Sequence, residues 1–437
     1  MAQHRRSGGR QLPALLRSRG TLADVYSGRN NSIGFLRLLL ATAVVLHHSM
    51  PLGFGEHDLG YELFRTQTAV GTLSVFGFFV LSGMLITRSA RGSTIPRYLW
   101  HRALRILPGL WACLVVTAFV VAPLVALREH GSLDGFFRGP NGPIQYVVNN
   151  MFTGVQQYGI HDLLQATTPW GRISGSSVFD GALWSLVYEM LCYVGVGLLA
   201  VVGVLRRARA LVLLGAIGAF ALVAMDHVRP GTWTAGPTGD YGVVVLPLIG
   251  GVSLMWLVYL GAFFAFGACM ELYRERIPIN DALGVASAVV FVTSLLVGGF
   301  FVVGFVAYAY VLIWLAVVLP RQLHWVGRKA DYSYGVYIYG FIGQQVFASL
   351  GWNRWGFVVF SAISVAAAYA AAYLSWHGVE KHALALKAWT PRLRRAPVQS
   401  APTPAGPSLE ASLGPAPEAT VDVSAEERRP AGSHAGA

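Results

Sequence analysis

The sequence predicts an all-α protein, a polytopic transmembrane helical bundle with about ten spans. Two observations lead to this prediction. Of the 437 residues, 54% are hydrophobic and only 12% are charged, and the mean hydropathy is +0.52. Soluble domains carry about twice that share of charged residues. The apolar residues are also gathered into runs of about 20, the length that crosses a bilayer.

Each predicted span is one such run, bounded by polar or basic residues. The runs lie near 33–52, 69–88, 103–127, 183–203, 210–226, 247–272, 281–298, 300–319, 331–350 and 356–376. The sixth belongs to an apolar stretch of about 242–272 that is longer than one crossing requires. We expect a tilted helix or a re-entrant segment there.

The basic residues recur between the runs and form no single patch, which argues against nucleic acid as a partner despite the net charge of +12. If the N-terminus lies inside, the inner loops hold Arg88, Arg91, Arg97, Arg102, Arg105, Arg206, Arg207, Arg209, Arg274, Arg276, Arg321, Arg328, Lys329, Lys381, Lys387, Arg392, Arg394 and Arg395. The outer loops hold only Arg65, Arg128, Arg138, Arg172, Arg229 and Arg354. This bias follows the positive-inside rule and predicts that both termini are cytoplasmic.

Composition also divides the chain into three parts. Residues 1–32 hold six arginines and no apolar core with a cleavage site, so they are interpreted as a retained basic cytoplasmic leader. Residues 33–385 form the membrane-embedded domain. Residues 386–437, rich in Pro, Ala, Ser and Glu, are predicted to be a disordered cytoplasmic tail. The three cysteines lie in apolar runs without metal-ligand or disulfide spacing, so no metal site is predicted.

The first span carries the strongest chemical signal. Its sequence, IGFLRLLLATAVVLHHSMPL, keeps Arg37 near one end and His47 and His48 near the other. At 100° per residue, Arg37 and His48 return to within roughly 20° of one helix face, about 16 Å apart, whereas His47 points about 80° away. Either residue alone is explained equally well by anchoring at an interface. Together they predict a polar face that lines a pocket through the membrane.

Other polar residues lie in or beside later spans. Glu189 is expensive inside an apolar helix unless it is functional or balances a buried Arg or His. Arg102 and Arg105 are three residues apart and therefore neighbours on one helix face, where two guanidiniums suit a phosphate; anchoring of the loop is the simpler explanation. Ser82 beside Gly83 allows close helix packing, and Tyr334 belongs to a tyrosine-rich segment that lines a polar cavity or forms an interfacial belt.

Several of these segments together resemble acyltransferase family 3, a family of multi-pass membrane O-acyltransferases that modify O-antigens and exopolysaccharides. The resemblance rests on Arg37 with His48, on FFVLSG, RALRILP and LWSLVYE, and on the closing GVEK. These motifs appear in the family's order and extend from about 33 to 385, nearly the whole membrane domain.

The resemblance implies transfer of an acyl group, acetyl by preference, from cytosolic acyl-CoA to a hydroxyl of an extracytoplasmic or membrane-associated glycan, at the bacterial cytoplasmic membrane. Acyl-CoA would be a co-substrate, with no bound cofactor. His48 would be the general base, Arg37 would orient the donor, and Glu189 would fix the polar network of the pocket. Arg102 and Arg105 would hold the nucleotide phosphates, and Ser82, Trp184 and Tyr334 would contact substrate. A covalent acyl-His route is the other catalytic possibility.

Three other functions compete with this one. A transporter or flippase of a polar or glycolipid substrate has a similar number of spans, but it would be expected to show inverted repeats, and none is evident. A different His-dependent class of membrane acyltransferase would need a distant Asn–His pair that has no clear counterpart. An acyltransferase that acts on a secondary metabolite also stays open.

Overall fold

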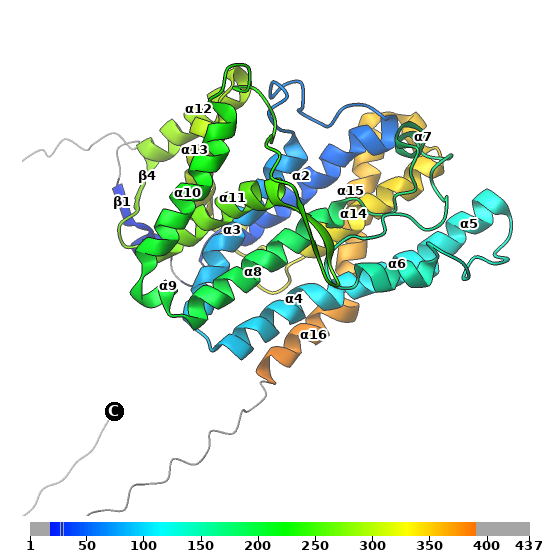
Figure 1. Ribbon diagram of the computed structural model, residues 1–437, viewed down its shortest axis with the longest axis horizontal. Coiled ribbons are helices and arrows are strands. Elements are labelled where there is room, and N and C mark those ends of the chain that lie inside the picture. The colour runs from blue at the N-terminus through cyan, green and yellow to red at the C-terminus, as the bar shows by residue number, and fades with distance from the viewer. Residues whose placement is uncertain (1–17, 27, 29, 390–437) are drawn as a thin grey trace, which may run out of the picture. The chain divides into compact units, whose positions relative to one another are not determined.

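The computed structural model describes residues 18–26, 28 and 30–389. This part of the chain is mostly helical, which confirms the predicted helical bundle (Figure 1). Its long helices are α2 (Ile33–Phe54), α3 (Val70–Arg91), α4 (Ile95–Val116), α8 (Leu186–Val201), α10 (Arg209–His227), α11 (Leu254–Leu272), α12 (Asp281–Val297), α13 (Phe305–Val318), α14 (Ser333–Ser349) and α15 (Phe357–Ser375). Shorter helices are α1 (Leu22–Val25), α5 (Ala122–His130), α6 (Pro143–Asn150), α7 (Pro169–Ser174), α9 (Val204–Arg207) and α16 (Lys381–Ala385).

Every predicted apolar run contains one of the long helices. Within the described residues, eight helical segments are long and apolar enough to cross a membrane. One of them is the continuous segment Ile95–His130, in which the π-helical turn Thr117–Val121 joins α4 to α5. Helices α12 and α14 are shorter, with 17 residues each. The count of about ten spans and the side of each terminus stay predictions.

The centre of the bundle is the packing of α3 on α11. A Cβ atom on Gly83 would lie 2.0 Å from the carbonyl oxygen of Phe264, and one on Gly267 would lie 1.9 Å from that of Val80. The two backbones can approach this closely only because both residues lack a side chain. Aromatic stacking fills the space beside them, where Phe76 lies 4.4 Å from Phe263 between ring centroids.

We predict that Gly267→Ala destabilises the fold by about 3 kcal/mol, because the added methyl group overlaps the α3 backbone and separates the helices. Gly261→Ala is the matched control on the same helix, since nothing lies within 4 Å of a Cβ there. That variant should unfold at the wild-type temperature or higher, because Ala favours a helix over Gly. Thermal unfolding of the purified proteins in detergent measures both, and equal behaviour would contradict the packing described.

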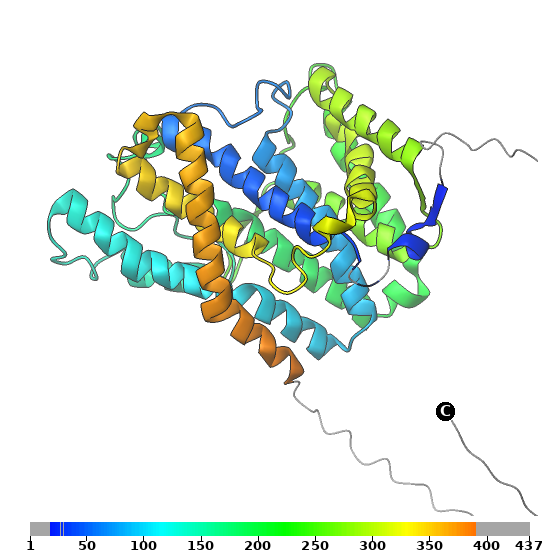
Figure 2. The same cartoon turned by 180° about the vertical axis from the view of Figure 1, so that it is seen from behind.

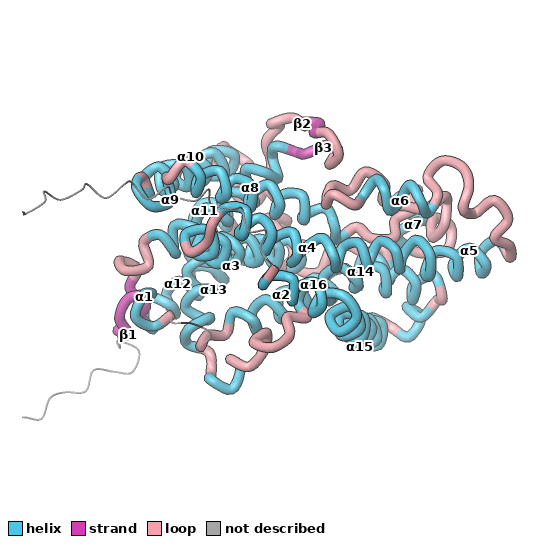
Figure 3. Tube along the Cα trace, turned by 90° about the horizontal axis from the view of Figure 1, so that it is seen from below, coloured by secondary structure: helices cyan, strands magenta, loops and turns pink. Residues whose placement is uncertain are grey.

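Two small antiparallel sheets lie apart from each other in the bundle (Figure 3). One pairs β2 (Val243–Leu246) with β3 (Gly250–Ser253), and the other pairs β1 (Ser18–Thr21) with β4 (Pro278–Asn280). The first corrects the expectation for residues 242–272, which are a hairpin followed by α11 and not one tilted or re-entrant helix. The sequence PLIGG permits the reversal, since Gly250 has a φ of +76°.

The leader and the loops join the bundle at several places. The described end of the leader pairs with β4, and Arg274 donates to the carbonyl of Tyr26 at 2.9 Å. The long loop between α5 and α8 folds with α6 and α7, and Asn150 joins two of its segments by donating to the Gln157 carbonyl at 2.7 Å. The predicted tail begins as a helical turn at Leu386–Ala388, and residues 390–437 lie outside the described residues.

Helices α2, α14 and α15 lie side by side along one side of the bundle (Figure 2). Buried Gln344 of α14 donates to the Val45 carbonyl and to the Ser49 hydroxyl of α2, both at 2.8 Å. These bonds fix α14 against the turn of α2 that carries His48.

The two ends of the bundle are named from α2. The end at which α2 begins is called the Arg37 end, and the opposite end is called the His48 end.

Candidate active site

Four charged side chains meet near the Arg37 end. Arg37 Nη1 lies 3.3 Å from Asp331 Oδ2, and Arg105 Nη2 lies 2.6 Å from the same oxygen. Arg105 Nη1 lies 3.3 Å from Glu380 Oε2. The cluster therefore joins α2, α4, the loop before α14 and the π-helical turn Trp376–Glu380 that follows α15.

Asp331 lies in the loop before α14, and its side chain is largely buried, with 21% exposed. Burial alone would raise the pKa of this carboxyl, but the guanidiniums of Arg37 and Arg105, together with the hydrogen bonds from Ser333, hold the pKa well below its ordinary value. The carboxyl is thus charged at any physiological pH, and it orients both arginines.

We predict that Asp331→Asn lowers the free energy of unfolding by about 3 kcal/mol, because it leaves two guanidiniums without their shared carboxylate. A carboxyl whose pKa is lowered by folding stabilises the protein at pH values above the pKa of the unfolded state. That stabilisation is lost as the pH falls toward the pKa of the folded state. The difference in free energy of unfolding between wild type and variant should therefore be constant above about pH 5 and shrink below about pH 4. Asp134→Asn, in an exposed loop, is the control. A difference that does not change with pH would contradict this account.

A cavity inside the bundle brings three of the predicted residues together. Arg37, Glu189 and Tyr334 line it, with Ser185 and Tyr337. The volume of about 40 Å³ holds only a few waters, so a substrate could enter only if the lining side chains moved. Glu189 accepts hydrogen bonds from Ser82 at 3.0 Å and from Tyr193, so hydroxyl groups satisfy this carboxylate rather than the Arg or His that the sequence suggested.

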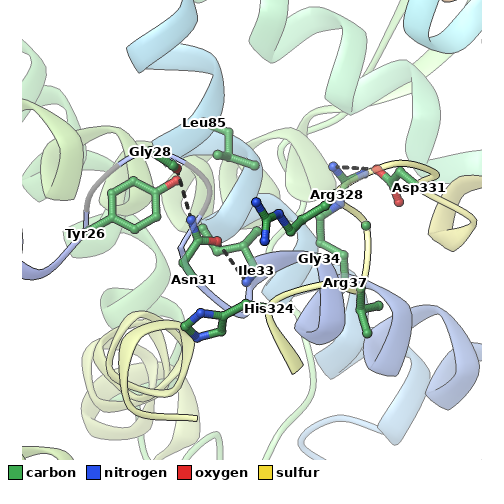
Figure 4. Close-up of a pocket in the computed structure, with 12 residues that line it drawn as sticks. Tyr26, Gly28, Asn31, Ile33, Gly34, Arg37, Leu85, His324, Arg328 and Asp331 are labelled. Carbon is green, nitrogen blue, oxygen red and sulfur yellow. Dashed lines mark hydrogen bonds and ion pairs between the residues drawn. The ribbon is translucent and has the colours of Figure 1, made fainter. Parts of the chain in front are cut away.

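A second pocket, of about 250 Å³, opens at the Arg37 end (Figure 4). In Figure 4 the Arg328 side chain extends across it toward Tyr26 and Asn31, and Arg37 with Asp331 lies at the opposite end. Arg37 lines both this pocket and the cavity with Glu189, so this residue is shared by the two hollows. A ligand that entered the pocket would reach Arg37 before anything deeper.

The two histidines have different surroundings, as the helical phase predicts. Buried His47 lies 3.4 Å from Asp58 Oδ1, in the loop after α2. Half-buried His48 lies edge-on to Phe341 of α14, with 5.1 Å between ring centroids. His48 is not among the residues that line the cavity with Glu189, and Phe341 lies between His48 and Gly181, which precedes the cavity residue Ser185.

The remaining predicted residues are distributed over two regions. Ser82 reaches the cavity through its bond to Glu189. Both terminal nitrogens of Arg105 contact carboxylates. The guanidinium of Arg102 lies 5.9 Å from the ring centre of Tyr193. Trp184 lies instead in a separate aromatic pocket, where its ring centroid is 4.8 Å from that of Trp256.

Sequence reasoning missed the partners of the two central arginines. Asp331 and Glu380 stand in or beside apolar runs, and the cost of placing a carboxylate there was the available signal. Arg105 and Asp331 are separated by 226 positions, so a single sequence gives no indication that the two side chains interact. Arg328, which lines the second pocket, is predicted from the sequence only as part of a basic inner loop, and His324 beside it carries no sequence signal.

Comparison with known proteins gives matches over most of the chain. A family model described as an acyltransferase domain matches residues 30–377. A Shigella phage Sf6 protein named O-acetyl transferase is 26% identical over 386 residues, which cover 82% of this chain and 96% of the relative. Nodulation protein 10 of Rhizobium leguminosarum bv. viciae is 26% identical over 381 residues, covering 83% and 95%. No solved structure gives a significant match.

Proposed function

The chain belongs to acyltransferase family 3 and is a multi-pass membrane acyltransferase, and from this premise we propose that it transfers acetyl from acetyl-CoA to a hydroxyl of an envelope glycan. The name of the phage relative, O-acetyl transferase, supports an oxygen acceptor. The basic residues at the Arg37 end support placing that end in the cytoplasm, where acetyl-CoA is found.

The observation that carries the proposal is that Arg37 lines both hollows. A thioester that entered from the pocket in Figure 4 would meet a guanidinium already oriented by Asp331 at 3.3 Å. A fixed cation is suited to the negative charge that develops on the carbonyl oxygen in acyl transfer. Arg37 would therefore orient and polarise the donor.

In the proposed reaction the acceptor hydroxyl approaches from the His48 end. His48 takes the hydroxyl proton as the oxygen attacks the thioester carbon. The carbon–sulfur bond then breaks, and the thiolate of coenzyme A leaves with the bonding electron pair and receives the proton from His48. A neutral imidazole suits this step, since its ordinary pKa lies near ambient pH. Arg37 and His48 are about 16 Å apart along α2. The Arg37 guanidinium would therefore have to turn toward His48, and Phe341, edge-on to His48, would have to move, for one thioester carbonyl to reach both residues.

Membranes that contain the protein, supplied with isotopically labelled acetyl-CoA and a panel of envelope glycans, test the proposal. We expect ester-linked label in one class of glycan, absent from membranes without the protein. Label on a small secondary metabolite would show that the protein is an acyltransferase whose acceptor is not a glycan. If no acceptor is labelled while a glycolipid crosses the membrane, the protein is a flippase and the proposal is wrong.

A further inference from the structure

A larger hollow at the Arg37 end adjoins the pocket in Figure 4. It has a volume of about 910 Å³, and one wall is the described part of the leader, with Arg19 and Asn30. The other wall is the end of α13 and the loop that follows, with Arg321, His324 and Arg328. We call this hollow the basic groove. Its volume is in the range of small-molecule sites.

The groove continues into the interior of the protein. His324 and Arg328 line both the groove and the pocket in Figure 4, and Arg37 lines both that pocket and the cavity with Glu189. The three hollows therefore follow one another from the surface to the middle of the bundle. The loop that lines the groove and the pocket in Figure 4 packs closely on α2, since a Cβ on Gly34 would lie 2.2 Å from the carbonyl oxygen of Val326.

The positive charges of the groove are not all neutralised by protein. Arg19 is paired with Asp281 at 2.9 Å. No carboxylate within the described residues lies within 4 Å of the Arg321 or Arg328 guanidinium. His324 Nε2 is buried and, among the same residues, has no hydrogen-bond partner. A buried polar atom without a partner is costly, so a ligand that bonds to it would stabilise the site.

We propose that the basic groove binds the phosphorylated nucleotide of acyl-CoA, whose thin arm then passes Arg328 and Arg37 to bring the thioester to the cavity. This inference rests on the proposed function and assigns its donor site. Guanidiniums are suited to phosphate, with which they form forked, charge-assisted hydrogen bonds. Arg105, predicted from its spacing for this task, already contacts Asp331 and Glu380 and is assigned to orienting them. An anionic lipid headgroup offers the same phosphate chemistry, so the test must separate it from the nucleotide.

The test compares two donors on the purified full-length protein in phosphatidylcholine nanodiscs. Acetyl-CoA carries the nucleotide phosphates, whereas acetyl-pantetheine has the same thioester and arm without them. Arg321→Gln and Arg328→Gln should each raise the KM for acetyl-CoA about tenfold, the effect of losing one charge-assisted hydrogen bond. Arg321→Gln should not change the KM for acetyl-pantetheine, because Arg321 lines the groove but not the pocket through which the arm passes. Both variants should weaken the binding of free coenzyme A by the same factor as they raise the KM for acetyl-CoA.

Arg276→Gln is the matched control, an exposed arginine at the same end that does not line the groove. Unchanged KM values for acetyl-CoA in both groove variants, or equal changes for the two donors, would overturn the groove assignment. Neither result would contradict the proposed acetyl transfer. Variants that alter only the response to added phosphatidylglycerol would also overturn the groove assignment and would make the groove a lipid site. If wild type transfers label from neither donor, the proposed function itself is wrong, and the donor site with it.

Discussion

His48→Ala is expected to lower the rate of acetyl transfer about 10²- to 10⁴-fold, the usual contribution of a positioned general base. The loss should appear in kcat, because His48 lies near the opposite end of α2 from the groove that we assign to the donor. The KM for acetyl-CoA should change little. Rates of label transfer at saturating acetyl-CoA, with the amount of folded protein measured by size-exclusion chromatography, give the comparison.

His47→Ala is the control, because it removes an adjacent imidazole from another face of the same helix. Its expected effect is on stability alone, since His47 lies 3.4 Å from Asp58 and helps to hold the loop after α2. Equal losses of transfer in both variants would indicate a shared structural role. Full activity in His48→Ala, in normally folded protein, would rule out His48 as the base.

Arg37→Gln is expected to lower transfer by at least about 10²-fold, the usual effect of removing one group that stabilises the developing oxyanion. A purely structural role is the competing explanation, because Arg37 is also paired with Asp331. The double variant Arg37→Gln/Asp331→Asn separates the two roles. It removes both charges of the pair, so it should fold better than Arg37→Gln alone and should still fail to transfer acetyl.

Recovery of transfer in the double variant would contradict the catalytic role of Arg37. Arg37→Lys refines the result, because lysine keeps the charge and loses the planar fork. We expect that variant to retain the protein fold and only a small part of the activity. The readout is again label transfer per folded protein.

The sequence was sufficient to predict the helices, whereas a pocket shared by Arg37 and His48 stays a prediction. Apolar runs of about 20 residues allow little besides helices in a membrane, because backbone groups must be paired within the segment. Helical periodicity alone separated His48 from His47, and the structure gives them different neighbours. The hairpin of β2 and β3 was missed because its valines are as apolar as those of a span.

Several residues that line the cavity were singled out from the sequence, but their interaction partners were not. Arg37, Glu189 and Tyr334 were each costly or unusual in an apolar setting, and they line one cavity. Their contacts depend on how distant segments of the chain pack together, and a single sequence does not show which segments are neighbours. Trp184 shows the limit of a motif, since it lies in the same segment as Glu189 but faces another pocket.

Transfer in proteoliposomes of known orientation tests the central claim most directly. Labelled acetyl-CoA, which does not cross the bilayer, would be supplied either to the Arg37 end or to the His48 end, with the glycan acceptor on the opposite side. We predict ester-linked label only when the donor is at the Arg37 end and the acceptor at the His48 end. Transfer only in the reverse arrangement, or equal transfer from both sides, would contradict the path from the basic groove past Arg37.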